Sequence, residues 1–326
     1  MSNYMTDQDR RWWELYRKAD KLSAADVVKI EKQLKSEPAN MDLRVQLFGY
    51  WYSQNFLKRK DTEQKLLEHV LWMIEYKPSV GGSIGHKCAM SAMRFTPRNF
   101  ATARQAWLEQ VDKHPINGVV VGNAGAFIAW NDFETGSHLL ERAARLDQSA
   151  GWLQLLSIHC NDQIWRLPFL YKDEMREKLI DVGVRSLKNE GDIGAPFITA
   201  EYVAEVALTL GRYDLVKYCA QAIYDYNPPE SVPVAKFYVS LLALREGDRR
   251  PALEMISQAK REELRQDMLF RLATALYELG ERDSIVQMIV SLKGKAKEHS
   301  RRRWLEQMAN SKPPDFLDAC MCDSCR

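Results

Sequence analysis

The residues with the clearest potential for chemistry are three cysteines close together near the end of the sequence, Cys320, Cys322 and Cys325. Thiolates spaced this closely can reach one ion, and zinc and copper(I) both favour thiolate ligands. A closed zinc site needs four ligands, so the fourth would come from Asp323, His299, another chain or a partner. Three interpretations of the segment stay open: a metal or redox site, a segment recognised or modified by another protein, or a tail without metal.

A second group of reactive residue types is His159, Cys160 and Asp162, which are types used by thiol-dependent enzymes. These residues follow one another in a short helical pattern, so their side chains cannot all converge on one reacting atom, and no oxyanion donor is identifiable beside them. We therefore interpret them as structural residues. Cys160, like Cys88 and Cys219, lies within an apolar helical pattern, where small buried thiols are common. This use of cysteine favours a reducing, cytoplasmic setting.

The stretch 81–88 has three glycines ahead of Lys87 and invites comparison with a phosphate-binding loop. The spacing of such a loop is missing, Cys88 stands in place of the magnesium-binding hydroxyl, and no strand precedes the stretch. We therefore predict a flexible loop between repeats. The histidines also lack the His-x-x-x-His spacing of a helical metal site. Together these observations predict a protein that is not an enzyme and needs no cofactor, with zinc or copper at the terminal cysteines as the alternative.

The composition is typical of a globular protein and excludes some classes of partner. The 326 residues include 46 Lys and Arg against 44 Asp and Glu, a formal net charge of +2, so no long-range cationic field is expected. The polar start of the sequence lacks the apolar core of a secretory signal. The longest uncharged stretch, 115–131, is interrupted by Gly and Asn and is too short to cross a bilayer. We expect neither a nucleic-acid nor a membrane partner.

The elements that must position these residues are predicted to be helices almost throughout, because apolar residues recur at i, i+3, i+4 and i+7 in nearly every segment. Ser23 and Asp26 have the spacing of a capping box at the start of a helix 24–36, and Pro38 follows its end. Helices at 40–54 and 99–113 have similar start and stop signals, with the Thr96 hydroxyl as the expected cap of the latter. Alternation typical of strands is nearly absent. The fold class is therefore predicted to be all-α.

Turn signals recur at regular intervals along these helices. Asn131, Gly211, Gly247 and Gly280 each separate two helices of about a dozen residues, and successive anchors are 80, 36 and 33 residues apart. The last two intervals correspond to single helix pairs. The first exceeds two pairs by about a dozen residues, and we assign the excess to an expanded loop near 159–172, where Pro168 breaks a helix.

This pattern resembles the tetratricopeptide-repeat family, whose unit of about 34 residues has small residues early in its first helix, a Gly-Asp-Tyr-like turn, Ala in its second helix and Pro at its end. The matching residues are Ala204, Gly211, Tyr213 and Pro228 in one unit, Gly247, Ala252 and Ala259 in the next, Ala273 and Gly280 in a third, and Ala124, Phe133 and Ala143 in an earlier one. Gly136 is a departure, because the family prefers Ala there. The resemblance covers most of 24–292, and it implies antiparallel helix pairs stacked into a right-handed superhelical solenoid.

The predicted organisation has four parts. Residues 1–22 form an N-terminal capping helix, and 23–292 form the repeats with the expanded loop. Residues 293–310 form a basic C-terminal capping helix, and 311–326 form a flexible tail that contains the three clustered cysteines.

A solenoid of this kind implies a function in binding, because its first helices line a concave groove that can hold an extended peptide or a helix. Alignment of the units by their turns places ten residues toward that groove: Val121, Ile128, Glu201, Glu205, Leu208, Phe237, Leu241, Leu244, Phe270 and Tyr277. We therefore predict a non-enzymatic scaffold or adaptor whose partner is a protein or peptide. The alternative is a metal- or redox-linked protein in which the solenoid docks a partner and the cysteine tail carries the chemistry.

Overall fold

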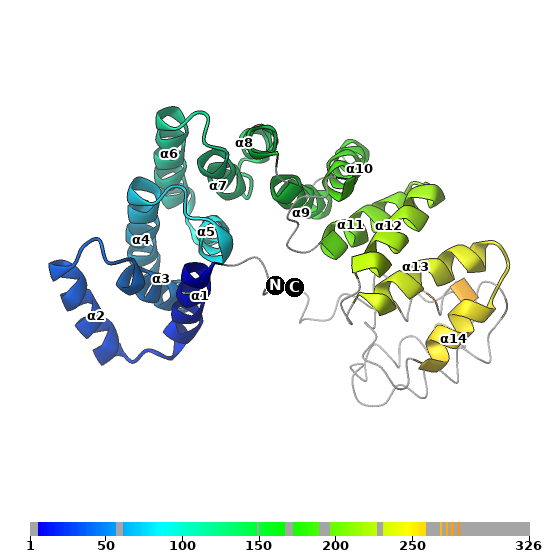
Figure 1. Cartoon of the computed structure of the whole chain (residues 1–326), viewed down its shortest axis with the longest axis horizontal. Coiled ribbons are helices and arrows are strands. Elements are labelled where there is room, and N and C mark those ends of the chain that lie inside the picture. Colours follow the sequence, from blue (N-terminus) through cyan, green and yellow to red (C-terminus); the bar gives the residue numbers. More distant parts are fainter. Residues whose placement is uncertain are drawn as a thin grey trace. The chain divides into compact units, whose positions relative to one another are not determined.

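The computed structural model describes residues 6–56, 61–148, 150–166, 172–188, 196–226 and 231–258, together with Met268, Leu272, Ala275, Leu276 and Gly280. Within these residues the secondary structure consists of fourteen α-helices and two short 3₁₀ helices, without a strand (Figure 1). The prediction of an all-α fold is therefore confirmed. No helix in the described ranges combines the length and the apolar character that a membrane span requires.

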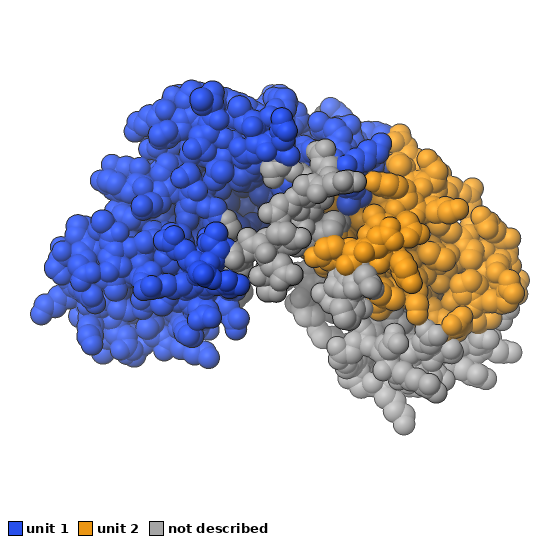
Figure 2. Space-filling model, viewed as in Figure 1, with its two compact units in different colours: residues 1–195 blue, residues 196–326 orange. Residues whose placement is uncertain are grey.

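The chain forms two compact units, Met1–Ala195 and Pro196–Arg326 (Figure 2). The helices of the first unit are α1 (Asp7–Lys18), α2 (Ala24–Ser36), α3 (Met41–Phe56), α4 (Thr62–Tyr76), α5 (Gly82–Met90), α6 (Pro97–Lys113), α7 (Gly118–Ile128), α8 (Phe133–Asp147), α9 (Ala150–Arg166) and α10 (Lys172–Lys188), with the 3₁₀ helices η1 (Ala19–Lys21) and η2 (Ser91–Arg94). The helices of the second unit are α11 (Pro196–Thr209), α12 (Tyr213–Tyr226), α13 (Val232–Arg245) and α14 (Arg250–Gln258).

Most helices pack against the next helix in the chain. Such consecutive pairs are α3 with α4, α7 with α8, and α9 with α10 in the first unit, and α11 with α12 and α13 with α14 in the second. Neighbouring pairs also contact each other, α8 with α9 in the first unit and α12 with α13 in the second. This consecutive packing is compatible with the helical repeat predicted from the sequence.

The start of α2 confirms the predicted capping box. The Ser23 hydroxyl accepts a hydrogen bond from the Asp26 amide at 3.2 Å, and the Asp26 carboxylate accepts one from the Ser23 amide at 3.0 Å. Hydrogen bonds from the Ser23 hydroxyl and amide lower the pKa of the Asp26 carboxyl. The helix spans Ala24–Ser36, as the capping residue and the following proline predict.

The start of α6 differs from the prediction at Thr96. Its side chain makes no capping hydrogen bond within α6. Instead its amide and hydroxyl donate to the Glu63 carboxylate at 2.6 and 2.8 Å, and the Asn99 side-chain amide donates to the same oxygen at 2.6 Å. Glu63 lies in the first turn of α4, so one carboxylate joins the beginnings of two helices. A capping rule that considers one helix alone does not include this partner.

The predicted glycine turns are confirmed by their backbone geometry. Gly211, Gly247 and Gly280 have φ angles of +70°, +86° and +89°, a region that side chains with a Cβ disfavour. After α11, the Arg212 amide donates to the Ala207 carbonyl at 2.8 Å and the Gly211 amide donates to the Leu208 carbonyl at 3.2 Å. The same two bonds recur at Gly247. This Schellman pattern satisfies carbonyls that the helix end would otherwise leave unpaired.

Glycines also allow α7 and α8 to approach closely. Ten of the eleven residues of α7 are buried, because α5, α6 and α8 surround it. A Cβ on Gly136 would lie 2.3 Å from the backbone nitrogen of Ala129, and a Cβ on Gly125 would lie 2.8 Å from that of Leu140. The departure from the repeat pattern at Gly136 therefore has a physical reason, since Ala does not fit between these backbones.

Two expectations about loops are wrong in the described residues. The stretch 81–88 is not a loop but most of α5, because Ile84, Cys88 and Ala89 bury their side chains and α5 packs on α1 and α7. The expanded loop does not begin at His159, because α9 continues to Arg166 with the buried residue Ile164 near its end. Residues 167–171 lie outside the described part of the chain.

Helix α1 packs along α3. Its residues include no fully buried side chain, yet Tyr16 lies in an aromatic group with Trp13, Phe48 and Tyr52, at centroid distances of 5.5 to 6.1 Å. The Trp12 indole donates to Asp42 at 3.1 Å. These contacts fit the role of a capping helix, whereas the predicted C-terminal capping helix, 293–310, lies outside the described residues.

Candidate functional site

Five of the ten residues predicted to face a groove are buried, and four of these are apolar residues in helix packing. Val121 and Ile128 of α7 are 0% exposed, because neighbouring helices cover every side of α7. Phe237 and Leu244 of α13 are 0% and 4% exposed. These four side chains stabilise the core, and in this structure they offer no surface to a partner.

Glu201 and Glu205 of α11, which were predicted to face the groove, are connected to α13 through Tyr238. The Tyr238 hydroxyl donates to a Glu205 carboxylate oxygen at 2.7 Å, and it lies 3.2 Å from the backbone carbonyl oxygen of Glu201. Tyr238 is itself fully buried, and Glu201 is buried as well. The structure therefore brings these two glutamates together around a packing contact between helices.

The remaining predicted groove residues are partly buried or not described. Leu208 of α11 and Leu241 of α13 are half-buried. Phe270 and Tyr277 lie outside the described residues. The same holds for the three cysteines proposed as metal ligands, Cys320, Cys322 and Cys325.

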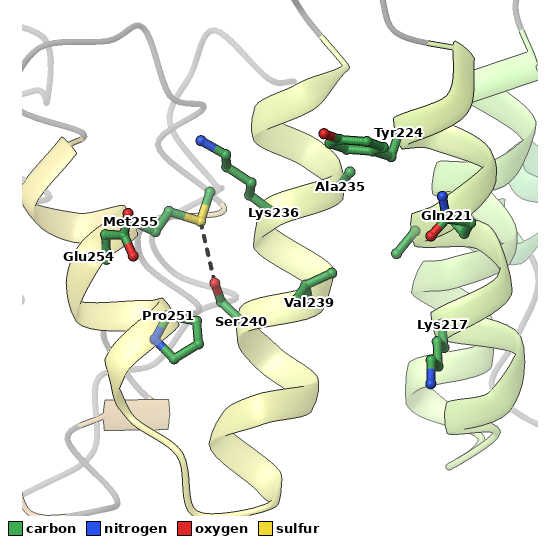
Figure 3. Close-up of a pocket in the computed structure, with 11 residues that line it drawn as sticks. Lys217, Gln221, Tyr224, Ala235, Lys236, Val239, Ser240, Pro251, Glu254 and Met255 are labelled. Carbon is green, nitrogen blue, oxygen red and sulfur yellow. Dashed lines mark hydrogen bonds between the residues drawn. The ribbon is translucent and has the colours of Figure 1, made fainter.

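A hollow of about 430 Å³ lies in the second unit, between α12 and α14 and over α13 (Figure 3). Helix α12 contributes one wall, α14 contributes the other, and α13 lies between them. The lining residues are Lys217, Ala220, Gln221, Tyr224, Ala235, Lys236, Val239, Ser240, Pro251, Glu254 and Met255. We call this site the α12–α14 hollow.

The α12–α14 hollow combines a buried apolar base with exposed apolar side chains. Ala220 and Ala235 are 3% and 2% exposed, whereas Tyr224 and Val239 are 54% and 52% exposed. The Ser240 hydroxyl donates to the Met255 sulfur at 3.9 Å, which joins α13 to α14 beneath the opening (Figure 3). Large apolar side chains that are exposed together beside a cavity are typical of binding sites.

The charges of the hollow are unevenly placed. Lys217 and Lys236 are exposed and lie at different ends of it, Lys236 at the Tyr224 end and Lys217 at the other (Figure 3). Within the described residues, neither ammonium group has a carboxylate within ion-pair distance. Glu254 lies on the α14 wall. The described lining residues therefore carry two positive charges and one negative charge.

Sequence reasoning missed this site because it selected the opposite face of α13. Successive residues of an α-helix are about 100° apart, so Val239, two positions after Phe237, lies on the other side of the helix. Phe237 packs inward and Val239 borders the hollow. One signal could have located the site: α13 has apolar residues on all of its faces, which leaves one apolar face uncovered when neighbours pack on the rest.

The described lining of the hollow offers groups that are suited to binding. The eleven described lining residues include neither histidine nor cysteine, and their polar groups are ammonium, hydroxyl, amide and carboxylate groups from several helix turns. These groups can hydrogen-bond, form ion pairs and cover apolar surface. No trio of nucleophile, base and orienting group is recognisable among the lining residues.

The cysteines of the described residues are buried thiols, as predicted. Burial raises the pKa of Cys88, Cys160 and Cys219 to about 12 each. A thiol with so high a pKa stays protonated near neutral pH and is a poor nucleophile. His159, next to Cys160, packs edge-on against Trp130 with 4.6 Å between ring centroids. These contacts support the structural interpretation of this segment.

No group of three or more potential metal ligands occurs in the ranges that the structure describes. Comparison with known proteins adds no assignment: no protein-family model matches the sequence, and no curated protein matches it.

Proposed function

We propose that the protein is a non-enzymatic scaffold that binds a segment of another protein, and that the α12–α14 hollow is one of its binding surfaces. The consecutive packing of helix pairs and the spacing of the glycine turns support this proposal. So does the resemblance to tetratricopeptide repeats, a family of right-handed superhelical binding proteins. The resemblance alone favours a groove lined by the first helix of each pair. The exposure of Tyr224 and Val239 favours the α12–α14 hollow instead.

The observation that carries the proposal is the exposure of Tyr224 and Val239 on either side of a buried apolar base. Covering the exposed half of a valine contributes about 1 kcal/mol, and tyrosine is enriched among residues that dominate binding energies. A partner side chain inserted over Ala235 would cover Tyr224 and Val239 together. The hollow thus offers one anchoring position for a short segment.

The experiment is a selection of displayed 12-residue random peptides on the full-length protein. Selected peptides are synthesised with a fluorescein label, and their affinities are measured by fluorescence polarisation for the wild type and for Val239→Asp. Because Val239 is half-exposed on a helix, the substitution is expected to leave the fold intact, which circular dichroism checks. We expect peptides that bind the hollow to lose at least 10-fold in affinity for Val239→Asp.

The matched control is Ile116→Asp, which places the same charge on another exposed apolar residue, outside the hollow. Ile116 is 84% exposed and lies between α6 and α7. Its substitution is expected to change peptide affinity by less than twofold. If no peptide is enriched, or if every selected peptide binds Val239→Asp as tightly as the wild type, the α12–α14 hollow is not a binding surface.

A further inference from the structure

We infer that the α12–α14 hollow selects an acidic segment: a short stretch of a partner in which an apolar residue is flanked by Asp or Glu. This inference rests on the proposed function and adds the chemistry of the occupant. It depends on the placement of Lys217 and Lys236 around the apolar base.

The two lysines differ from other lysines at junctions between helices. Lys65 of α4 pairs with Glu31 of α2 at 3.3 Å, and Lys178 of α10 pairs with Glu141 of α8 at 3.7 Å. Lys217 and Lys236 border a junction between helices too, but among the described residues no carboxylate lies within 4.0 Å of either ammonium group. Their charges are therefore available to carboxylates of an occupant.

The spacing of the charges limits the length of the segment. Lys217 and Tyr224 lie seven residues apart on α12, which corresponds to a rise of about 10 Å, and Lys236 lies at the Tyr224 end (Figure 3). An extended chain covers that distance with about three residues. Carboxylates on both sides of one or two apolar residues would thus reach both lysines while the apolar side chain covers Val239.

Glu254 opposes this preference but does not cancel it. It lies on the α14 wall, and the described lining residues retain an excess of one positive charge. Opposite charges at the rim of an interface mainly set partner choice and association rate. A basic segment would meet two like charges and one opposite charge, so an acidic segment is favoured.

The test uses the displayed random peptides and the full-length protein. Peptides whose binding is lost in Val239→Asp are sequenced and resynthesised with Asn and Gln in place of Asp and Glu. We expect them to be enriched in Asp and Glu beside an apolar residue, and the amide versions to bind at least 10-fold more weakly. The double variant Lys217→Glu/Lys236→Glu is expected to weaken the acidic peptides by at least 10-fold.

The control for charge is Lys32→Glu/Lys35→Glu on α2, which changes the net charge equally through two exposed lysines of the other unit. It is expected to change affinity by less than twofold. The inference is overturned if the peptides that lose binding in Val239→Asp are not enriched in Asp and Glu. It is also overturned if these peptides bind Lys217→Glu/Lys236→Glu as tightly as the wild type. Either result leaves the proposed binding function standing. A complete absence of hollow-dependent peptides would overturn both.

Discussion

His69 is expected to make the first unit sensitive to acid. It lies on α4, its side chain is 3% exposed, and within the described residues its Nδ1 has no hydrogen-bond partner. Burial, together with the charges of Arg44 and Lys65, lowers the pKa of His69 to about 3, from an ordinary value of 6.5. Arg44 is also buried and lies over the Trp72 ring at 4.5 Å, so its charge is held close to the imidazole.

The direction and size of the effect follow from proton linkage. Between pH 6.5 and pH 3 the unfolded chain protonates His69 while the folded chain keeps it neutral, so stability falls as the pH falls through this window. Each pH unit well inside the window corresponds to about 1.4 kcal/mol. Because protonation of the unfolded chain is half complete at pH 6.5, the loss between pH 6.5 and pH 4.5 is about 2 kcal/mol.

The measurement is urea unfolding of the full-length protein at both pH values, followed by tryptophan fluorescence. Eight of the nine tryptophans lie in the first unit, so fluorescence reports mainly on the unit that contains His69. Other groups also titrate in this range, so the informative quantity is the difference between the wild type and His69→Leu. Leucine fills a similar volume and has no polar atom to bury.

We expect the stability of the wild type relative to His69→Leu to fall by about 2 kcal/mol between pH 6.5 and pH 4.5. The control is Val70→Ala, which removes buried apolar volume from the same helix and has no titrating group. Its cost of about 1–3 kcal/mol should be the same at both pH values. A wild-type minus His69→Leu difference that stays within 0.5 kcal/mol across this range would refute the argument from burial and neighbouring charges.

Three further substitutions test the packing of the helices by urea unfolding. Gly136→Ala should lower the free energy of unfolding by about 1–2 kcal/mol, because its Cβ would overlap the backbone at the end of α7. Gly81→Ala, with no atom near the added Cβ, should lower it by less than about 0.5 kcal/mol. Equal losses in the two variants would contradict the close approach of α7 and α8. Gly211→Ala should lose about 1–2 kcal/mol through its φ of +70°, and an unchanged midpoint would contradict the left-handed turn. Tyr238→Phe should lower the free energy of unfolding by about 1 kcal/mol with the hydrogen bond to Glu205, and this loss should be smaller in a Glu205→Ala background, where the hydroxyl keeps only the Glu201 carbonyl as acceptor.

The sequence correctly predicted those helix starts and turns that are determined by residues a few positions apart. Ser23 and Asp26 determine the start of α2 by themselves, and the positive φ at Gly211 favours a residue without a Cβ whatever surrounds it. The stretch 81–88 shows the limit of such reasoning. Its glycines suggest a loop, but α5 forms because Ile84 and Cys88 become buried against other helices, and this depends on contacts distant in sequence.

The hollow could be predicted only in part, because periodicity locates apolar faces without saying which face a neighbour covers. Phe237 and Val239 are both apolar and lie on opposite sides of α13. Neighbouring helices cover the first and leave the second half-exposed. The sequence therefore indicates that α13 is apolar all round, whereas the structure identifies which side remains open.

The rotation of α13 about its own axis links the stability of the second unit to its proposed binding surface. Tyr238 is fully buried and donates to Glu205 of α11, so this side of α13 is held toward α11. The neighbouring Phe237 then packs in the core, at 5.1 Å from the Tyr238 ring, and Val239 is directed to the hollow. A rotation that exposed Phe237 would break the hydrogen bond of a buried hydroxyl, which costs about 1–3 kcal/mol. The hydrogen bond that Glu205 accepts therefore stabilises the one orientation of α13 in which the hollow retains its apolar anchor.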